Sequence, residues 1–135
     1  MDINIWGKSI WACIHYVALG YPVAPSYSDK EKYKQFFLTL GPVLPCYKCS
    51  VNFQKHLTEI PIDPYLENQE KLFEWTVKLH NLVNKENSKP TYTVEQAKQY
   101  YLKGESKPKS NFNASYLIVS GFVILMVVFL LRKSI

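Results

Sequence analysis

Apolar residues recur every three or four positions through most of the first hundred residues, which is the spacing of one face of an α-helix. The first stripe ends before Pro22 and is formed by Ile10, Ile14, Val17 and Tyr21. We find no stretch that alternates apolar and polar residues in the way that a half-buried β-strand does. The pattern therefore predicts an all-α domain.

Two further helices are expected in the next forty residues. The first follows Ser28-x-x-Glu31, a capping-box pattern, and carries Tyr33, Phe36, Phe37 and Leu40. Gly41-Pro42 interrupts the chain, and Pro45 then precedes a helix that ends near Pro61. Its apolar face would hold Cys49, Phe53 and Leu57.

A fourth helix is predicted from the stripe Leu72, Trp75, Leu79, Leu82 and Val83. The pattern Thr93-x-x-Gln96 is expected to cap a short fifth helix that ends near Tyr101. The predicted fold of residues 1–103 is therefore a four-helix bundle with a short fifth helix.

The C-terminal part of the sequence has a different character. Residues 104–113 are polar and contain glycine, proline and serine, which is typical of a linker. Residues 114–131 carry no charge, and as a helix they would rise about 27 Å, close to the thickness of a bilayer core. We therefore predict a single-pass transmembrane helix at 114–131, followed by a short basic tail at 132–135. The N-terminus has no basic region or long apolar run, so no signal peptide is expected.

Composition and charge narrow the classes of function. The 135 residues are 47% hydrophobic and 15% aromatic, which suits one compact domain. The net charge is +5, but lysine and glutamate are mixed along the chain and form no basic stripe. Nucleic-acid binding is therefore not expected.

The chain has three cysteines, and two of them stand in LPCYKC as Cys46 and Cys49. A structural zinc site needs four ligands, and the histidines are scattered at positions 15, 56 and 80. A disulfide inside Cys-x-x-Cys closes a very small loop, so it constrains the unfolded chain little. At the N-terminus of a helix, beside Lys48, such a pair has a stabilised thiolate. Thiol–disulfide exchange is the favoured chemistry, with zinc and a structural staple as alternatives.

Two polar and aromatic faces accompany this pair. Gly7, Trp11 and His15 are spaced four apart and share one face of the first helix. In the fourth helix a polar patch is formed by His80, Asn81, Asn84 and Lys85. Such a mixture suits a flat aromatic cofactor with a sugar and phosphates. The competing interpretation puts the tryptophans in the core and the polar patch in solvent.

Three motifs, WGKSIWACIHYVALGYP, LPCYKC and FEWTVKLHNLVNK, occur in this order. Together they resemble the Erv/ALR family of FAD-linked sulfhydryl oxidases, over roughly the first hundred residues. The resemblance implies a helical bundle that binds FAD and is usually a homodimer. It also implies that substrate dithiols are oxidised and that electrons pass through FAD to oxygen, giving hydrogen peroxide.

The resemblance also assigns roles by position. Cys46 corresponds to the outer, exchanging cysteine and Cys49 to the one next to the flavin. The first-helix positions near FAD are Gly7, Trp11, His15 and Tyr21. Those of the fourth helix are Trp75, His80, Asn81, Val83, Asn84 and Lys85, and Lys89 is expected to reach a phosphate.

The chain departs from many relatives in its cysteines. The region KPTYTVEQ lacks the cysteine of a second disulfide, and with only Cys13 left there is no shuttle pair. Small family members from large DNA viruses also have few cysteines, and a viral chain would lie in a host or virion membrane.

The implied partner is a protein dithiol, on a thioredoxin-like or Cys-x-x-Cys carrier. Cys13 is expected to pack among apolar neighbours. The alternative function is a tail-anchored helical interaction module without catalysis.

Overall fold

The computed structural model describes residues 1–103. They form the α-helices α1 Ile3–Leu19, α2 Tyr27–Leu40, α3 Tyr47–Glu59, α4 Gln69–Glu86 and α5 Val94–Lys103, with short 3-10 helices at Gly41–Val43 and Asp63–Tyr65. The expected all-helical class is confirmed. The linker 104–113, the membrane helix 114–131 and the tail 132–135 lie outside the described residues. Within residues 1–103, no helix combines the length and apolar character needed to span a membrane.

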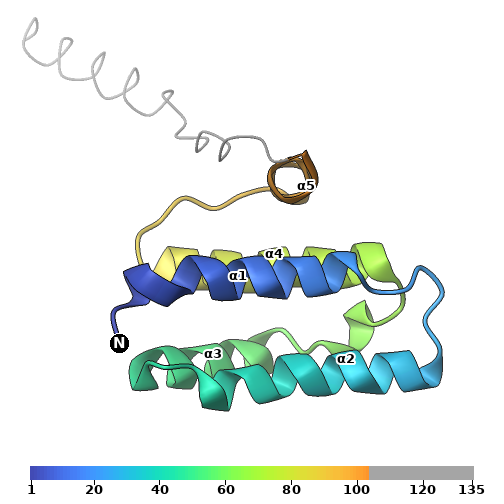
Figure 1. The fold of residues 1–135 in the computed structure, drawn as a ribbon, viewed down its shortest axis with the longest axis horizontal. Coiled ribbons are helices and arrows are strands. Elements are labelled where there is room, and N and C mark those ends of the chain that lie inside the picture. The colour runs from blue at the N-terminus through green and yellow to red at the C-terminus, as the bar shows by residue number, and fades with distance from the viewer. Residues whose placement is uncertain (104–135) are drawn as a thin grey trace, which may run out of the picture.

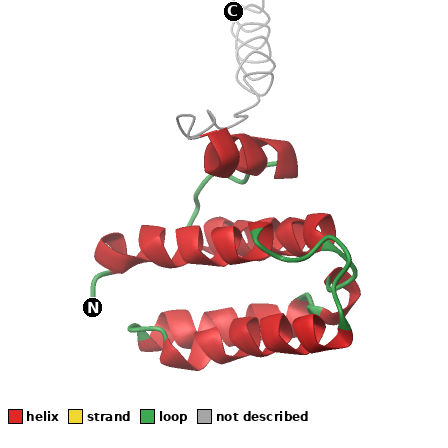
Figure 2. Cartoon of the chain, turned by 45° about the vertical axis from the view of Figure 1, so that its right-hand side comes forward, coloured by secondary structure: helices red, strands yellow, loops and turns green. Residues whose placement is uncertain are grey.

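The helices are arranged in layers (Figures 1 and 2). α1 and α4 lie side by side in one layer, and α2 and α3 form the layer on one side of it. α5 lies on the opposite side of the α1/α4 layer and contacts both of its helices. This arrangement puts the N-terminal ends of α1 and α3 and the C-terminal half of α4 at the same end of the domain.

Local capping sets where the helices begin. α2 begins earlier than predicted, because the capping box is formed by Ser26 and Asp29 and not by Ser28 and Glu31. The Ser26 amide donates to the Asp29 carboxylate, while the Asp29 amide donates to the Ser26 hydroxyl. The capping box of α5 is confirmed, since Thr93 and Gln96 exchange side-chain to backbone hydrogen bonds.

The core lies where α1, α2 and α4 meet. Phe37 of α2 is fully buried, and its ring centroid lies 5.2 Å from that of Trp75 in α4. The Trp75 indole donates to the Ile60 carbonyl at 2.8 Å, and the Tyr21 hydroxyl donates to the Leu66 carbonyl at 3.0 Å. These hydrogen bonds satisfy the polar atoms of two large buried side chains.

Cys13 does not pack as expected, because its side chain is exposed on α1. The neighbouring Ile14 is fully buried and contributes the core contact at this level of the helix. A step of one residue turns an α-helix by about 100°, so one of two adjacent positions commonly faces solvent.

The packing of Phe37 in α2 against Trp75 in α4 predicts how a substitution changes stability. Replacing Phe37 with alanine should lower the free energy of unfolding by about 3–5 kcal/mol, because it leaves a cavity against Trp75. Tyr27 of the same helix is 79% exposed, so Tyr27→Ala is the control and should change stability little. Urea denaturation measures both. Equal losses in the two variants would contradict the packing described here.

Candidate active site

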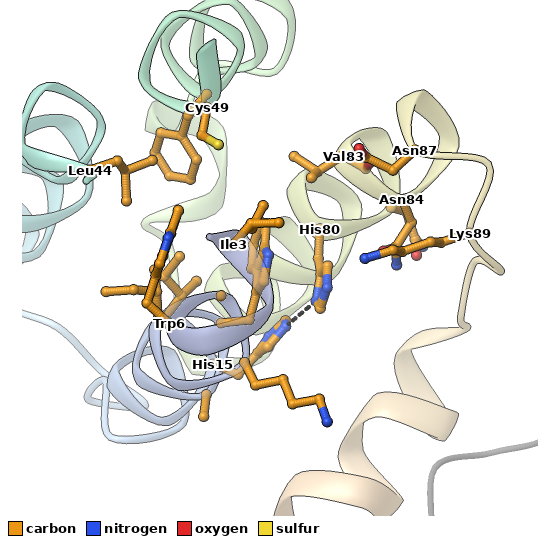
Figure 3. Close-up of a pocket in the computed structure, with 18 of the residues that line it drawn as sticks. Ile3, Trp6, His15, Leu44, Cys49, His80, Val83, Asn84, Asn87 and Lys89 are labelled. Atoms are coloured by element: carbon orange, nitrogen blue, oxygen red, sulfur yellow. Dashed lines mark hydrogen bonds between the residues drawn. The ribbon is translucent and has the colours of Figure 1, made fainter. Parts of the chain in front are cut away.

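A cavity of about 820 Å³ opens between α1, α3, α4 and α5 (Figure 3). This volume is within the range of about 300–1,000 Å³ that is usual for small-molecule sites. Ten of the residues predicted to act in catalysis or to contact a cofactor line it: Gly7, Trp11, His15, Cys46, Cys49, His80, Asn81, Val83, Asn84 and Lys89.

Cys46 and Cys49 form a disulfide at the N-terminus of α3. Cys46 is the N-cap residue and has an extended backbone, with φ −137° and ψ 114°. The amide of Cys49 donates to the Cys46 sulfur at 3.2 Å, so this sulfur satisfies one donor of the first helical turn that has no partner within the helix. Both cysteines are half-buried, and Figure 3 shows Cys49 facing the space between α1 and α4. The disulfide is therefore accessible and lies on the electropositive end of a helix.

A buried histidine lies between α3 and α4, next to two carboxylates, and among residues 1–103 its Nε2 has no hydrogen-bond partner. His56 of α3 is 2% exposed, and its Nδ1 lies 2.9 Å from a carboxylate oxygen of Glu59. Its Nε2 lies 3.2 Å from a carboxylate oxygen of Glu86 on α4. Asn52 also donates to Glu86, at 3.1 Å. The Asn52–Glu86 hydrogen bond links the helix that carries the disulfide to the helix that carries His80.

An aromatic stack joins α1 to α4 inside the cavity. The rings of Trp11 and His80 are parallel, with centroids 3.9 Å apart. His15 lies behind them, with Nε2 3.0 Å from His80 Nδ1 and Nδ1 3.0 Å from the Thr76 hydroxyl. Burial, followed by the charge of His80, lowers the pKa of His15 to about 3. His15 is therefore neutral at physiological pH.

The loop after α4 places Lys89 at the cavity. The Asn81 side chain accepts from the Tyr92 amide at 3.0 Å and donates to the Tyr92 carbonyl at 2.8 Å, which holds this loop against α4. The Lys89 amide donates to the Asn84 carbonyl at 2.8 Å. Ser88 between them has φ 52°, a left-handed conformation that reverses the chain direction. Asn81 is thus engaged in positioning the loop.

α5 covers the far side of the His15 ring. The ring of Tyr101 lies 4.4 Å from that of His15, and burial, followed by the neighbouring tyrosines, raises the pKa of Tyr101 to about 12. The sequence pattern did not single out this residue. Other lining residues that it missed are Trp6, Leu44, Asn52, Phe53, Glu86, Asn87, Tyr92, Gln96 and Tyr100. The aromatic pair Tyr100-Tyr101 was one available signal, and Trp6 stands at the start of the motif WGKSIW.

Three residues that the resemblance assigned to the cofactor lie away from the cavity lining. Tyr21 and Trp75 are buried in the core, where their polar atoms are hydrogen-bonded to backbone carbonyls. Lys85 is exposed on the outer face of α4. A direct contact of these three with a cofactor stays a prediction from the resemblance.

The donor set of the cavity fits a flat aromatic cofactor that carries phosphates. Among residues 1–103, the indole Nε1 of Trp6 is a buried donor without a hydrogen-bond partner, and Trp6 lines the cavity. Lys8, Lys48 and Lys89 add positive charge to the lining. Gly7 is buried, and a Cβ atom there would come 3.1 Å from Ile3. The cavity therefore combines ring surfaces, an unused donor and cations.

Known proteins resemble this chain over most of the described residues. The model of the Erv1 / Alr family matches residues 8–102. The probable FAD-linked sulfhydryl oxidase R368 of Acanthamoeba polyphaga mimivirus is 39% identical over 115 residues, covering 84% of this chain and 80% of the relative. The mitochondrial FAD-linked sulfhydryl oxidase ERV1 of Saccharomyces cerevisiae is 35% identical over 91 residues, covering 67% of this chain. The match spans 47% of the length of that yeast protein.

Solved structures show the same fold. The crystal structure of the FAD-binding domain of Erv1 from Saccharomyces cerevisiae has a TM-score of 0.72 and 32% sequence identity. The match covers 78% of this chain and 99% of that domain. The yeast Erv1 core gives a TM-score of 0.71 at 31% identity.

The low pKa of His15 predicts how stability depends on pH. The unfolded chain binds a proton near the ordinary histidine pKa of 6.5, whereas the folded chain binds it only near pH 3. The free energy of unfolding should therefore fall as the pH is lowered through this window, by up to about 1.4 kcal/mol per pH unit. His15→Gln lacks the group, so its stability should fall less steeply in urea titrations. Parallel pH profiles for the two proteins would contradict the prediction.

Proposed function

The chain belongs to the Erv1/Alr family, and we propose that it is an FAD-dependent thiol oxidase that makes disulfides in substrate dithiols. One observation in this structure supports the proposal independently of family membership. The Cys46–Cys49 disulfide opens onto the same cavity as the stacked rings of Trp11 and His80. A redox disulfide and a surface suited to a flat cofactor are thus adjacent.

The residues that would hold FAD follow from the cavity lining. Trp11 and His80 offer ring surfaces, Trp6 offers a buried N–H donor, and Lys89 offers a charge for phosphate. When bound, FAD accepts the electron pair of the cysteines and passes it to oxygen, giving hydrogen peroxide. Val83 and Phe53 would limit the access of water to this region, since both line the cavity with apolar atoms.

The cysteine pair performs the exchange with substrate. A substrate thiolate attacks the Cys46 sulfur, the Cys46–Cys49 bond breaks, and the Cys49 sulfur leaves as a thiolate. The positive N-terminal end of α3 favours negative charge at the pair, and the Cys49 amide, which donates to the Cys46 sulfur, would stabilise a thiolate at Cys46. The second substrate thiol then attacks the mixed disulfide, which releases oxidised substrate and leaves Cys46 and Cys49 reduced. The released Cys49 sulfur already lies at the cavity, where it can be reoxidised.

We propose that the substrate meets Cys46 directly. Cys13 is exposed, but it is the only other cysteine of the chain and has no partner for a second redox pair. An exposed dithiol on a thioredoxin-like or Cys-x-x-Cys carrier meets this requirement, because such thiols are accessible and low in pKa. We also propose that the protein is a homodimer, as the family resemblance implies.

Replacement of the cysteines tests the electron path. Cys46→Ser and Cys49→Ser should each abolish dithiol-dependent oxygen consumption, because exchange needs both sulfurs. FAD should remain bound in both variants, since the small loop contributes little to the fold. Oxygen uptake and visible flavin absorbance measure the two properties separately.

Cys13→Ala is the matched control for the loss of a thiol. Cys13 is exposed, so this variant should keep wild-type oxygen consumption and stability. Turnover that persists in Cys49→Ser, or that is lost in Cys13→Ala, would contradict the assignment of the redox pair.

Membrane attachment is proposed from the sequence of residues 114–131. A chain that ends within the linker 104–113 should keep its flavin and its activity but lose its association with membranes. Fractionation of cell extracts by centrifugation measures the association, with the full chain as the reference. If the shortened chain stays in the membrane fraction, the anchor lies elsewhere.

A further inference from the structure

Exposed apolar side chains flank the redox disulfide. Val43 and Tyr47 are 73% and 86% exposed, and Val51, one helical turn after Tyr47, is 46% exposed. Val43 precedes Cys46 by three residues and Tyr47 follows it directly, so their Cα atoms lie within about 11 Å of that of Cys46. These three side chains form what we call the disulfide rim. Single exposed apolar side chains are common, but a group of them around a reactive bond indicates a contact surface.

The start of α1 extends this apolar surface on the other side of the cavity. Met1 and Ile3 line the cavity together with Cys46, and they are 78% and 38% exposed. The half-buried disulfide therefore lies between two sets of exposed apolar side chains, one from α1 and one from the segment around the start of α3.

The charge beside the disulfide is positive. Lys48 is exposed and stands between the two cysteines, and no residue from Gly41 to Thr58 is acidic. Among the described residues that line the cavity, the one carboxylate is that of Glu86, and it already accepts a hydrogen bond from Asn52. The N-terminus of α3 adds its own partial positive charge. The surface therefore favours a partner segment that carries negative charge.

The chemistry of the exchange requires the substrate to lie over this surface. A substrate thiolate forms a bond with the Cys46 sulfur, the Cys46–Cys49 bond breaks, and the Cys49 sulfur takes the electron pair. A second substrate thiolate then attacks the substrate sulfur of the mixed disulfide and releases Cys46 as a thiolate, so two electrons pass from substrate to protein. In a disulfide the two Cα atoms are about 5.5–6 Å apart, and neighbouring residues of a chain are about 3.8 Å apart. The residues next to the substrate cysteine are therefore held close to Val43 and Tyr47.

We propose that the disulfide rim and Lys48 form a docking surface for the substrate segment that carries the reacting thiol, and that this surface selects a segment with an apolar residue next to its cysteine and an acidic residue close by. The inference rests on the proposed function, because it concerns the substrate of the same disulfide. The rim covers the apolar side chain of the substrate, and the Lys48 ammonium pairs with its carboxylate. A small dithiol such as dithiothreitol has neither feature.

Two synthetic peptides with the same Cys-x-x-Cys sequence test the selection. One carries leucine before the first cysteine and glutamate after the second, and the other carries serine and lysine at these positions. Each peptide is mixed with the full chain without oxygen, the reaction is stopped with an alkylating reagent, and mass spectrometry follows the appearance of the Cys46 and Cys49 thiols. Each rate is divided by the rate at which the same peptide reduces hydroxyethyl disulfide, which corrects for the reactivity of the peptide's own thiols.

After this correction, the leucine and glutamate peptide should react about tenfold faster, as expected when part of an apolar side chain is buried. Equal corrected rates would overturn the proposal. The measurement follows the disulfide and not the flavin, so the two claims are separated. Selective reaction in a protein that holds no flavin would support the docking surface and contradict the oxidase function, whereas a disulfide that neither peptide reduces would overturn both.

Substitutions at the rim test which side chains select. Tyr47→Ser and Val43→Ser should each remove most of the preference for the leucine and glutamate peptide. Tyr27→Ser and Val23→Ser are the matched controls, because these side chains are 79% and 75% exposed and belong to the start of α2 and the loop before it, at the opposite end of the domain from the start of α3 (Figure 1). A preference that survives in both rim variants, or that falls equally in the controls, would overturn the role of the rim.

Lys48→Gln tests the charge. In the wild-type chain the preference for the glutamate peptide should fall as salt is added, because ions screen exposed charges. In Lys48→Gln the preference should be smaller and should no longer depend on salt. A salt dependence that is the same in both proteins would overturn the role of Lys48. If rim variants change the oligomeric state in analytical ultracentrifugation but not the peptide preference, the rim binds a second copy of the chain and the proposal is wrong.

Discussion

The contact between α1 and α4 through His15 is the interaction on which the site depends. His15 is almost fully buried, yet both of its ring nitrogens are hydrogen-bonded to side chains of α4. A buried imidazole without such partners would cost stability, so these two bonds determine how the helices face each other. They also hold His80 flat against Trp11, and that stack forms a wall of the cavity. The packing of the bundle and the shape of the site thus have the same cause.

The position of the disulfide depends on a second feature, the start of α3. Cys46 is both the N-cap of α3 and one half of the redox pair, so the start of this helix and the reactive sulfur coincide. Asn52 of α3 then donates to Glu86 of α4, which keeps the start of α3 close to the α1/α4 wall. Electron transfer between a disulfide and a flat cofactor needs the two to be adjacent and their separation to be stable. Hydrogen bonds between helices contribute to that here, and Cys46–Cys49 is the single disulfide among residues 1–103, with Cys13 left as a free thiol.

The sequence predicted the helices well because their signals are local. Helical spacing of apolar residues and the Thr93/Gln96 box need no knowledge of the tertiary structure. It misplaced the start of α2 because two overlapping patterns, at Ser26 and at Ser28, look alike until the backbone is known. Lining residues such as Trp6 and Tyr101 were missed for another reason. Their place at the cavity depends on how α1 and α5 pack on α4, which no local pattern reveals. No local pattern singled out Thr76 either, because His15, which its hydroxyl contacts, is 61 residues away in the sequence.

The central claim is that electrons from a thiol reach bound FAD through Cys49. It is tested most directly by adding a dithiol to the purified protein without oxygen and following the visible absorbance of the flavin. The account predicts that the wild-type flavin loses its absorbance and regains it when oxygen is admitted. It predicts that the Cys49→Ser protein, with the same flavin content, keeps its absorbance throughout. A wild-type protein without flavin, or a flavin that the dithiol reduces equally well in the Cys49→Ser protein, would contradict the account.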